Sequence, residues 1–243
     1  MTRLSVTLAV AILIGSSVGA VTHSAPLAPE AAWELVAENL LAGDFVVLDV
    51  RTSAEFSRGH LPLALNLDLY RPDFRDRLAE LDRDNTYLVY CRSGARSARA
   101  TRLMAALGFP RVHDLRGGIL AWERAGLPVK SPDRPSIALS PQQASLLLEL
   151  HRADPALVVI DVRTPREFAG GHIFGAANLD LYAPDLRARL ASLPRDAAYL
   201  IYCRSGHRSA VAARVMQELG FALIFELEGG ILAWEEAGLP LEG

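Results

Sequence analysis

The sequence contains little cysteine, no excess of positive charge and no long apolar run. Two cysteines in 243 residues cannot form a disulfide framework or supply a thiolate-rich zinc site. The formal net charge is −3, from 25 basic and 28 acidic side chains, and gives no support to a nucleic-acid binder that works through bulk positive charge. Hydrophobic residues make up 51% and charged residues 22%, as in a folded globular chain.

The amino terminus has the pattern of a cleaved signal peptide. Arg3 supplies positive charge, residues 8–14 are continuously apolar, and small residues follow up to Ala20. The apolar run is far shorter than the roughly 18 residues that a membrane-spanning helix needs. We therefore expect a signal peptide at residues 1–20, export to the bacterial periplasm, and no stable membrane span after cleavage.

Most of the remaining chain is a tandem repeat of one sequence unit. Three motifs recur 112 residues later in the sequence: Asp-Val-Arg-Thr at 49–52, Cys-Arg-Ser-Gly at 91–94 and Gly-Gly-Ile-Leu-Ala-Trp at 117–122. Such a period is too long for a solenoid repeat and fits a whole small domain. A polar stretch with two prolines separates the copies, as in a short linker. The sequence therefore predicts the following units: domain 1 at residues 27–128, a linker at 129–136 and domain 2 at 137–243.

Short apolar runs and helical patterns alternate within each copy. In the first copy, residues 45–48 and 87–90 have the composition of buried strands, and residues 72–81 and 97–107 have helical spacing. In the second copy, Ser140 followed by proline is typical of a helix start. This alternation predicts an α/β fold in each domain, with a small, mainly parallel sheet and helices on both faces.

Each cysteine directly follows a predicted strand and precedes a predicted helix. Backbone N–H groups and the positive end of the helix dipole make such a loop an anion cradle and lower a thiol pKa. Arginines and small polar residues accompany both cysteines. We predict Cys91 and Cys203 as catalytic nucleophiles. The residues predicted to bind the substrate are Arg92, Ser93, Gly94, Arg96 and Ser97 in the first copy and Arg204, Ser205, Gly206, His207, Arg208 and Ser209 in the second.

With these loops, the chain resembles the rhodanese family, as a tandem two-domain member. The resemblance depends on the Cys-Arg-Ser-Gly-x-Arg-Ser loop, the closing Gly-Gly-x-x-Ala-Trp and a third block in each copy. That block is Asp-Val-Arg followed by Glu-Phe and Gly-His: Asp49, Arg51, Glu55, Phe56, Gly59 and His60, repeated as Asp161, Arg163, Glu167, Phe168, Gly171 and His172. We interpret this third block as structural, and Trp122 and Trp234 as core residues.

The resemblance implies a sulfurtransferase that moves a sulfane sulfur through a cysteine persulfide. The expected partners are a small anionic donor such as thiosulfate and a thiol or cyanide acceptor. This reaction needs no cofactor and no metal. His60 and His172 lack the spacing of a ligand pair.

Two other functions remain open at this point. One is a cysteine-dependent phosphatase, although only four residues separate Cys91 from Arg96, one fewer than such an enzyme needs. The other is a module that binds sulfur carriers or partner proteins without catalysis.

The two copies also differ near the predicted chemistry. Leu63 stands where the second copy and the usual family pattern have glycine, and we expect it to shift a wall of the first pocket. Arg116 in the first copy becomes Glu228 in the second. Since nearby cations favour a thiolate and carboxylates oppose it, we expect Cys91 to be the more acidic thiol.

Overall fold

A computed structural model describes residues 25–152 and 154–243. The predicted signal peptide, residues 1–20, lies outside the described residues. Within the described ranges, no helix is long and apolar enough to cross a membrane.

The first domain contains a four-stranded parallel sheet in the order β2-β1-β3-β4. Its strands are β1 (Phe45–Asp49), β2 (Ala64–Asn66), β3 (Thr86–Tyr90) and β4 (Val112–Asp114). Its helices are α1 (Pro29–Glu38), α2 (Ser53–Phe56), α3 (Phe74–Ala79), α4 (Ala95–Ala106) and α5 (Gly118–Arg124). Helices α1 and α5 bury their apolar side chains on one face of the sheet, and α3 and α4 cover the other.

The second domain repeats this arrangement and adds an edge strand, giving the parallel order β5-β9-β8-β6-β7. Its strands are β5 (Ile137–Leu139), β6 (Leu157–Asp161), β7 (Ala177–Asn178), β8 (Ala198–Tyr202) and β9 (Leu223–Leu227). Its helices are α6 (Pro141–Leu150), α7 (Pro165–Ala169), α8 (Leu186–Ala191), α9 (His207–Glu218) and α10 (Gly230–Glu236). In the first domain, a single bridge between Leu27 and Leu115 replaces the edge strand. The predicted fold class is confirmed.

The burial of the central strands agrees with their amino-acid composition. Residues 87–90 of β3 and all of β8 are buried, which matches the continuous apolar runs expected of strands covered on both faces. Helix α6 begins where predicted, because the Ser140 side chain accepts from the Gln143 N–H in a capping box.

Two predicted helices have different bounds in the structure. Helix α3 occupies only residues 74–79 of the predicted 72–81. Helix α4 begins at Ala95 rather than at Ser97, because Gly94 adopts a left-handed φ of 101° at the N-cap position and turns the chain directly from the loop into the helix.

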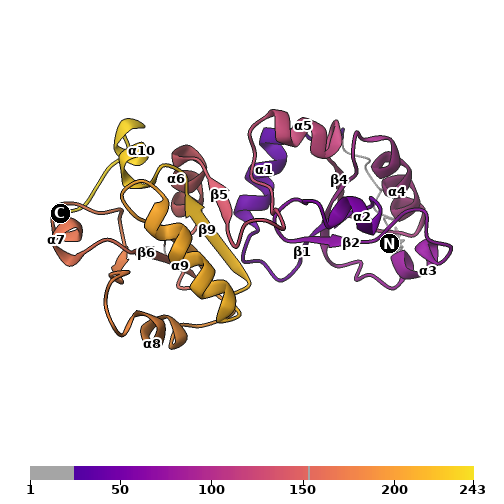
Figure 1. The fold of residues 1–243 in the computed structure, drawn as a ribbon. Coiled ribbons are helices and arrows are strands. Elements are labelled where there is room, and N and C mark those ends of the chain that lie inside the picture. Colours follow the sequence, from indigo (N-terminus) through magenta and orange to yellow (C-terminus); the bar gives the residue numbers. More distant parts are fainter. Residues whose placement is uncertain (1–24, 153) are drawn as a thin grey trace, which may run out of the picture.

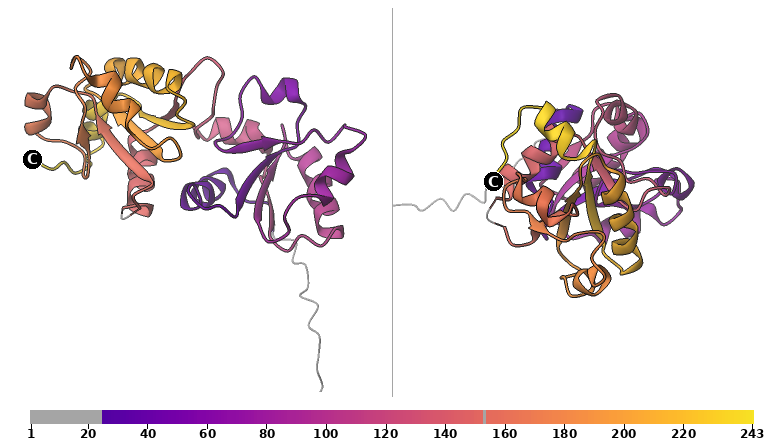
Figure 2. Two further views of the ribbon diagram at one scale, coloured as in Figure 1. Left: turned by 90° about the horizontal axis from the view of Figure 1, so that it is seen from below. Right: turned by 60° about the vertical axis from the view of Figure 1, so that its left-hand side comes forward.

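The two domains lie side by side in both Figure 1 and the left view of Figure 2. Helices α1 and α6 pack against each other between the two sheets. Nε2 of His151, just after α6, lies 2.7 Å from the carbonyl oxygen of Ala37 in α1. The contact between the domains therefore includes the packing of α1 against α6.

Candidate functional site

Each cysteine lies at the carboxyl end of a central strand, in the loop that leads into the next helix. Cys91 follows β3 and Cys203 follows β8, and both are only 1% exposed. Both are free thiols. The structure therefore places both predicted nucleophiles where a parallel sheet presents its functional groups.

The loop backbone turns its N–H groups toward the sulfur. The Gly94 N–H donates to Cys91 Sγ at 3.1 Å, and the Gly206 N–H donates to Cys203 Sγ at 3.2 Å. A serine hydroxyl lies behind each sulfur, with Ser97 Oγ at 3.5 Å and Ser209 Oγ at 3.6 Å. We call these donors around each thiol the cysteine cradle.

The cradle favours the thiolate. Burial alone raises the pKa of Cys91, but hydrogen bonds from the Ser97 hydroxyl and from the backbone of Ser97, Ser93 and Gly94 outweigh it, so the pKa lies below its ordinary value. The pKa of Cys203 is also lowered, because the backbone and hydroxyl of Ser209 and the backbone of Ser205 and Gly206 outweigh burial. Both loops therefore stabilise the deprotonated form of their cysteine.

The repeated Gly-Gly motif supports each loop from behind. The N–H of Ile119 donates to the Cys91 carbonyl at 2.9 Å, and the N–H of Leu120 donates to the Arg92 carbonyl at 3.1 Å. Gly118 has a left-handed φ of 59°, and a Cβ there would overlap the Cys91 carbonyl oxygen. Only glycine therefore allows α5 to approach this closely. Gly230 and Cys203 repeat the arrangement.

The second arginine of each loop is held by a glutamate from the third sequence block. Arg96 forms two hydrogen bonds with Glu55, at 2.6 and 2.7 Å, and Arg208 forms two with Glu167, at 2.8 and 2.7 Å. The Arg96 guanidinium lowers the pKa of Glu55 to about 2, and the Thr52 N–H and hydroxyl contribute. These arginines lie beside the loops, with their guanidinium groups fixed by paired carboxylates.

The other predicted binding side chains point outward. Arg92, Ser93, Arg204, Ser205 and His207 are exposed. Beside the first loop, a pocket of about 410 Å³ is lined by both cationic and acidic groups. They include Arg92, Arg58, Glu55 and Glu123.

Most of the third block performs the structural role that we expected. Arg51 and Asp49 form a buried ion pair at 2.6 Å, and the Tyr90 hydroxyl donates to the same carboxylate at 2.6 Å. Arg163 and Asp161 repeat the ion pair. The exception is the glutamate, which reaches the cysteine loop, and the sequence interpretation missed this link. A signal was present, since both Glu55 and Arg96 recur together in the second copy.

The remaining expectations concern single side chains. Trp122 and Trp234 are buried and donate to the carbonyls of Pro128 and Pro240, as core residues do. His60 stacks on Phe56, with ring centroids 3.9 Å apart.

Leu63 has a φ of 60°, close to the 72° of its counterpart Gly175. The leucine therefore accepts a backbone conformation that suits glycine. Leu63 is not among the described residues that line the pocket beside the first loop.

Comparison with known proteins agrees with this architecture. A family model described as "Rhodanese-like domain" matches the chain twice, at residues 32–125 and 142–237. A sulfurtransferase of Allochromatium vinosum is 42% identical over 90 residues, which are 37% of this chain and 82% of that protein. Thiosulfate sulfurtransferase 16 of Arabidopsis thaliana is 37% identical over 106 residues, covering 40% of this chain and 88% of that protein. Thiosulfate sulfurtransferase GlpE of Pseudomonas putida is 38% identical over 104 residues, covering 43% and 88%.

Each of these relatives aligns with about one domain's length of the chain. The two family matches include both cysteine loops and both Gly-Gly motifs. The chain therefore belongs to the rhodanese family, as a member with two tandem rhodanese-like domains.

Proposed function

We propose that this protein is a sulfurtransferase that carries sulfane sulfur as a persulfide on Cys91 and Cys203. The observation that carries the proposal is the cysteine cradle, in which amide and hydroxyl donors surround a buried thiol of lowered pKa. The names of the similar sulfurtransferases support the same reaction class.

In the first step, the thiolate attacks the outer sulfur of a donor such as thiosulfate. A Cys–S bond forms, the S–S bond of the donor breaks, and sulfite leaves with the bonding electron pair. Arg92 in the first domain and Arg204 in the second are exposed at the loop and attract the anionic donor. The paired Arg96 and Arg208 add positive charge beside the sulfur.

In the second step, the acceptor takes the outer sulfur. Cyanide or a thiolate attacks the outer persulfide sulfur, the bond to the cysteine sulfur breaks, and the cysteine leaves as a thiolate. The cradle stabilises this leaving thiolate through the same donors that lower its pKa. We further propose that the protein acts after export to the bacterial periplasm, because residues 1–20 have the pattern of a signal peptide.

Parallel activity assays test the proposal. Purified mature protein is incubated with thiosulfate and cyanide, and sulfite and thiocyanate are measured; a second arm measures hydrolysis of a phosphate ester. We expect sulfite and thiocyanate in equal amounts, no phosphate release, and no activity in the Cys91→Ser/Cys203→Ser double variant. Phosphate release without sulfite would instead support a phosphatase, and no turnover in either arm would support a binding module.

A further inference from the structure

The serine behind each thiol has only one proton to donate. Ser97 and Ser209 are both fully buried, and their hydroxyls lie beside the cysteine sulfurs. A hydroxyl that donates to the sulfur stabilises the thiolate. A hydroxyl that donates elsewhere can only accept at the sulfur, and it then favours the protonated thiol. The other acceptors near each serine therefore influence the acidity of the cysteine.

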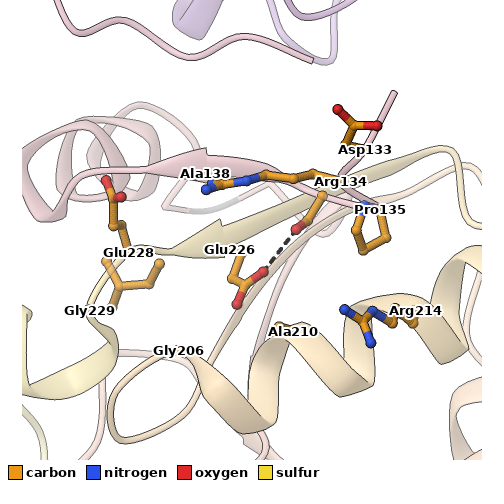
Figure 3. Close-up of a pocket in the computed structure, with 12 residues that line it drawn as sticks. Asp133, Arg134, Pro135, Ala138, Gly206, Ala210, Arg214, Glu226, Glu228 and Gly229 are labelled. Carbon is orange, nitrogen blue, oxygen red and sulfur yellow. Dashed lines mark hydrogen bonds between the residues drawn. The ribbon is translucent and has the colours of Figure 1, made fainter. Parts of the chain in front are cut away.

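In the second domain, a carboxylate also lies within hydrogen-bond distance of this hydroxyl. Ser209 Oγ lies 2.8 Å from Glu226 Oε1, compared with 2.9 Å from the Gly206 carbonyl and 3.6 Å from Cys203 Sγ. A carboxylate is the strongest of these acceptors. The buried Ser136 donates to Glu226 Oε2 at 2.9 Å, shown by the dashed line in Figure 3. Glu226 is therefore held between two buried hydroxyls.

In the first domain, the residue at the place of Glu226 is one methylene shorter. It is Asp114, at the end of β4. Among residues 25–152 and 154–243, Ser97 and Asp114 make no close hydrogen bond like the 2.8 Å bond between Ser209 and Glu226; the Ser97 hydroxyl interacts with this carboxyl more weakly, and Asp114 Oδ1 has no hydrogen-bond partner. Burial raises the pKa of Asp114, partly offset by the nearby Ser97 hydroxyl and by Arg102. The Ser97 hydroxyl is left with the Gly94 carbonyl at 3.1 Å and the Cys91 sulfur.

Other charged groups also face Glu226. A cavity of about 430 Å³ beside it is lined by the following charged residues: Asp133, Arg134, Arg214 and Glu228 (Figure 3). Two arginines offset two acids, so the surroundings of Glu226 are balanced in charge. The hydrogen bonds from Ser209 and Ser136, rather than a general acidic field, therefore distinguish Glu226 from Asp114.

We propose that Glu226 is a positioning residue that competes with Cys203 for the Ser209 hydroxyl hydrogen, weakens the stabilisation that this hydroxyl gives the Cys203 thiolate, and thereby makes Cys203 the less acidic of the two thiols. Cys91, whose serine has no carboxylate as close as Glu226 to compete for its hydrogen, holds the larger thiolate fraction at neutral pH. The difference in acidity has one consequence that rests on the proposed function. The Cys203 thiolate, when formed, is the stronger nucleophile toward a sulfur donor, because nucleophilicity rises with thiol pKa.

The rate of alkylation by iodoacetamide, measured against pH in single-cysteine proteins, tests this assignment. In the Cys91→Ser background, Glu226→Asp should lower the apparent pKa of Cys203 by about one unit, since it recreates the first domain. In the Cys203→Ser background, Asp114→Glu should raise the apparent pKa of Cys91. Glu228→Gln is the matched control, because it removes a carboxylate from the same cavity without touching Ser209. The sequence assigned the difference in acidity to Glu228, but the described Glu228 side chain makes no hydrogen bond to the cysteine cradle, so this variant should shift the pKa of Cys203 by less than about 0.3 units.

Substitution of the two cradle serines distinguishes the effect of their hydrogen bonds from that of packing. Ser97→Ala should raise the apparent pKa of Cys91 by about one unit, and Ser209→Ala should shift that of Cys203 by less than half as much. Equal shifts in the two domains, or a Cys203 pKa unchanged by Glu226→Asp, would overturn the assignment. Alkylation needs no sulfur donor, so this result stands apart from the test of sulfur transfer.

Discussion

The two domains hold their cysteines in nearly the same way but surround them differently. The cradle N–H lies 3.1 Å from the sulfur in one domain and 3.2 Å in the other, and an Arg–Glu pair flanks both loops. Beside the loop, however, Arg58 in the first domain corresponds to Gly170 in the second, and Asp114 corresponds to Glu226. The comparison indicates that backbone geometry provides the shared chemistry, while nearby side chains tune each site.

The largest effect should come from breaking one cradle and leaving the other intact. Gly118→Ala forces a Cβ against the Cys91 carbonyl, so the loop must move. We expect loading of sulfur on Cys91 to fall at least about tenfold, with Cys203 unaffected, because a misplaced donor costs more than about 1 kcal/mol. Site-resolved mass spectrometry after thiosulfate treatment measures both cysteines in one sample.

Gly126→Ala is the matched control for this change. Gly126 also has a left-handed φ, of 66°, but a Cβ there meets no described atom within 4 Å. It tests backbone strain without overlap and should leave sulfur loading on both cysteines unchanged. Normal loading of Cys91 in Gly118→Ala would show that close packing of the Gly-Gly motif is not needed for the cradle.

Removal of either paired arginine should have a smaller effect than Gly118→Ala, and the effect should be equal in the two domains. We expect kcat/KM for thiosulfate to fall about tenfold in Arg96→Ala, measured in the Cys203→Ser background, and equally in Arg208→Ala, measured in the Cys91→Ser background. Each change removes a charge-assisted pair and a cation near the sulfur. Arg99→Ala, on the exposed side of α4, is the control. Unequal losses would contradict the equivalence of the two loops.

The paired glutamates should affect stability in acid. The pKa of Glu55 is about 2, below its ordinary 4.5, so its ion pair stabilises the folded state above pH 4.5 and loses this contribution as the pH falls toward 2. At pH 7, Glu55→Gln should cost about 1–2 kcal/mol, a value reduced for partial exposure. The cost should shrink at pH 3, as urea unfolding at both pH values would measure.

Two further variants complete the acid test. Glu167→Gln should behave like Glu55→Gln, because the Arg208 guanidinium lowers the pKa of Glu167 to about 2 as well. Glu38→Gln, at an exposed position on α1, should change the unfolding free energy little at either pH. A cost for Glu55→Gln that stays constant from pH 7 to pH 3 would contradict the lowered pKa.

The smallest effect concerns Arg58, an exposed cation whose counterpart in the second domain is Gly170. Arg58→Gly should lower the ratio of alkylation by anionic iodoacetate to that by neutral iodoacetamide at Cys91 by about two- to threefold at low salt. Gly170→Arg should raise the same ratio at Cys203. If neither ratio changes, Arg58 does not attract anions to the first site.

The sequence predicted the fold and the positions of both cysteine loops because these features are local or repeated. Buried strands appear as apolar runs, and each cysteine loop lies between a strand and a helix that can be identified separately. A repeat at a constant offset showed that the loops occur in equivalent domains.

Contacts between distant segments were not predictable in this way. Glu55 and Arg96 are 41 residues apart, and only the packing of α2 beside the cysteine loop brings their side chains together. The difference between Asp114 and Glu226 is a single methylene, and its effect on Ser209 depends on distances of a few tenths of an ångström. Periodicity and motif spacing do not contain such distances.

The most direct test of the central proposal is the intact mass of the purified protein after thiosulfate treatment. The wild type should gain up to two increments of about 32 Da, one per persulfide, and Cys91→Ser and Cys203→Ser should each gain one. A reductant should remove every increment, and the double variant should gain none. Absence of any increment with several sulfane donors, or an increment that persists in the double variant, would contradict sulfur transfer through the two cysteine cradles.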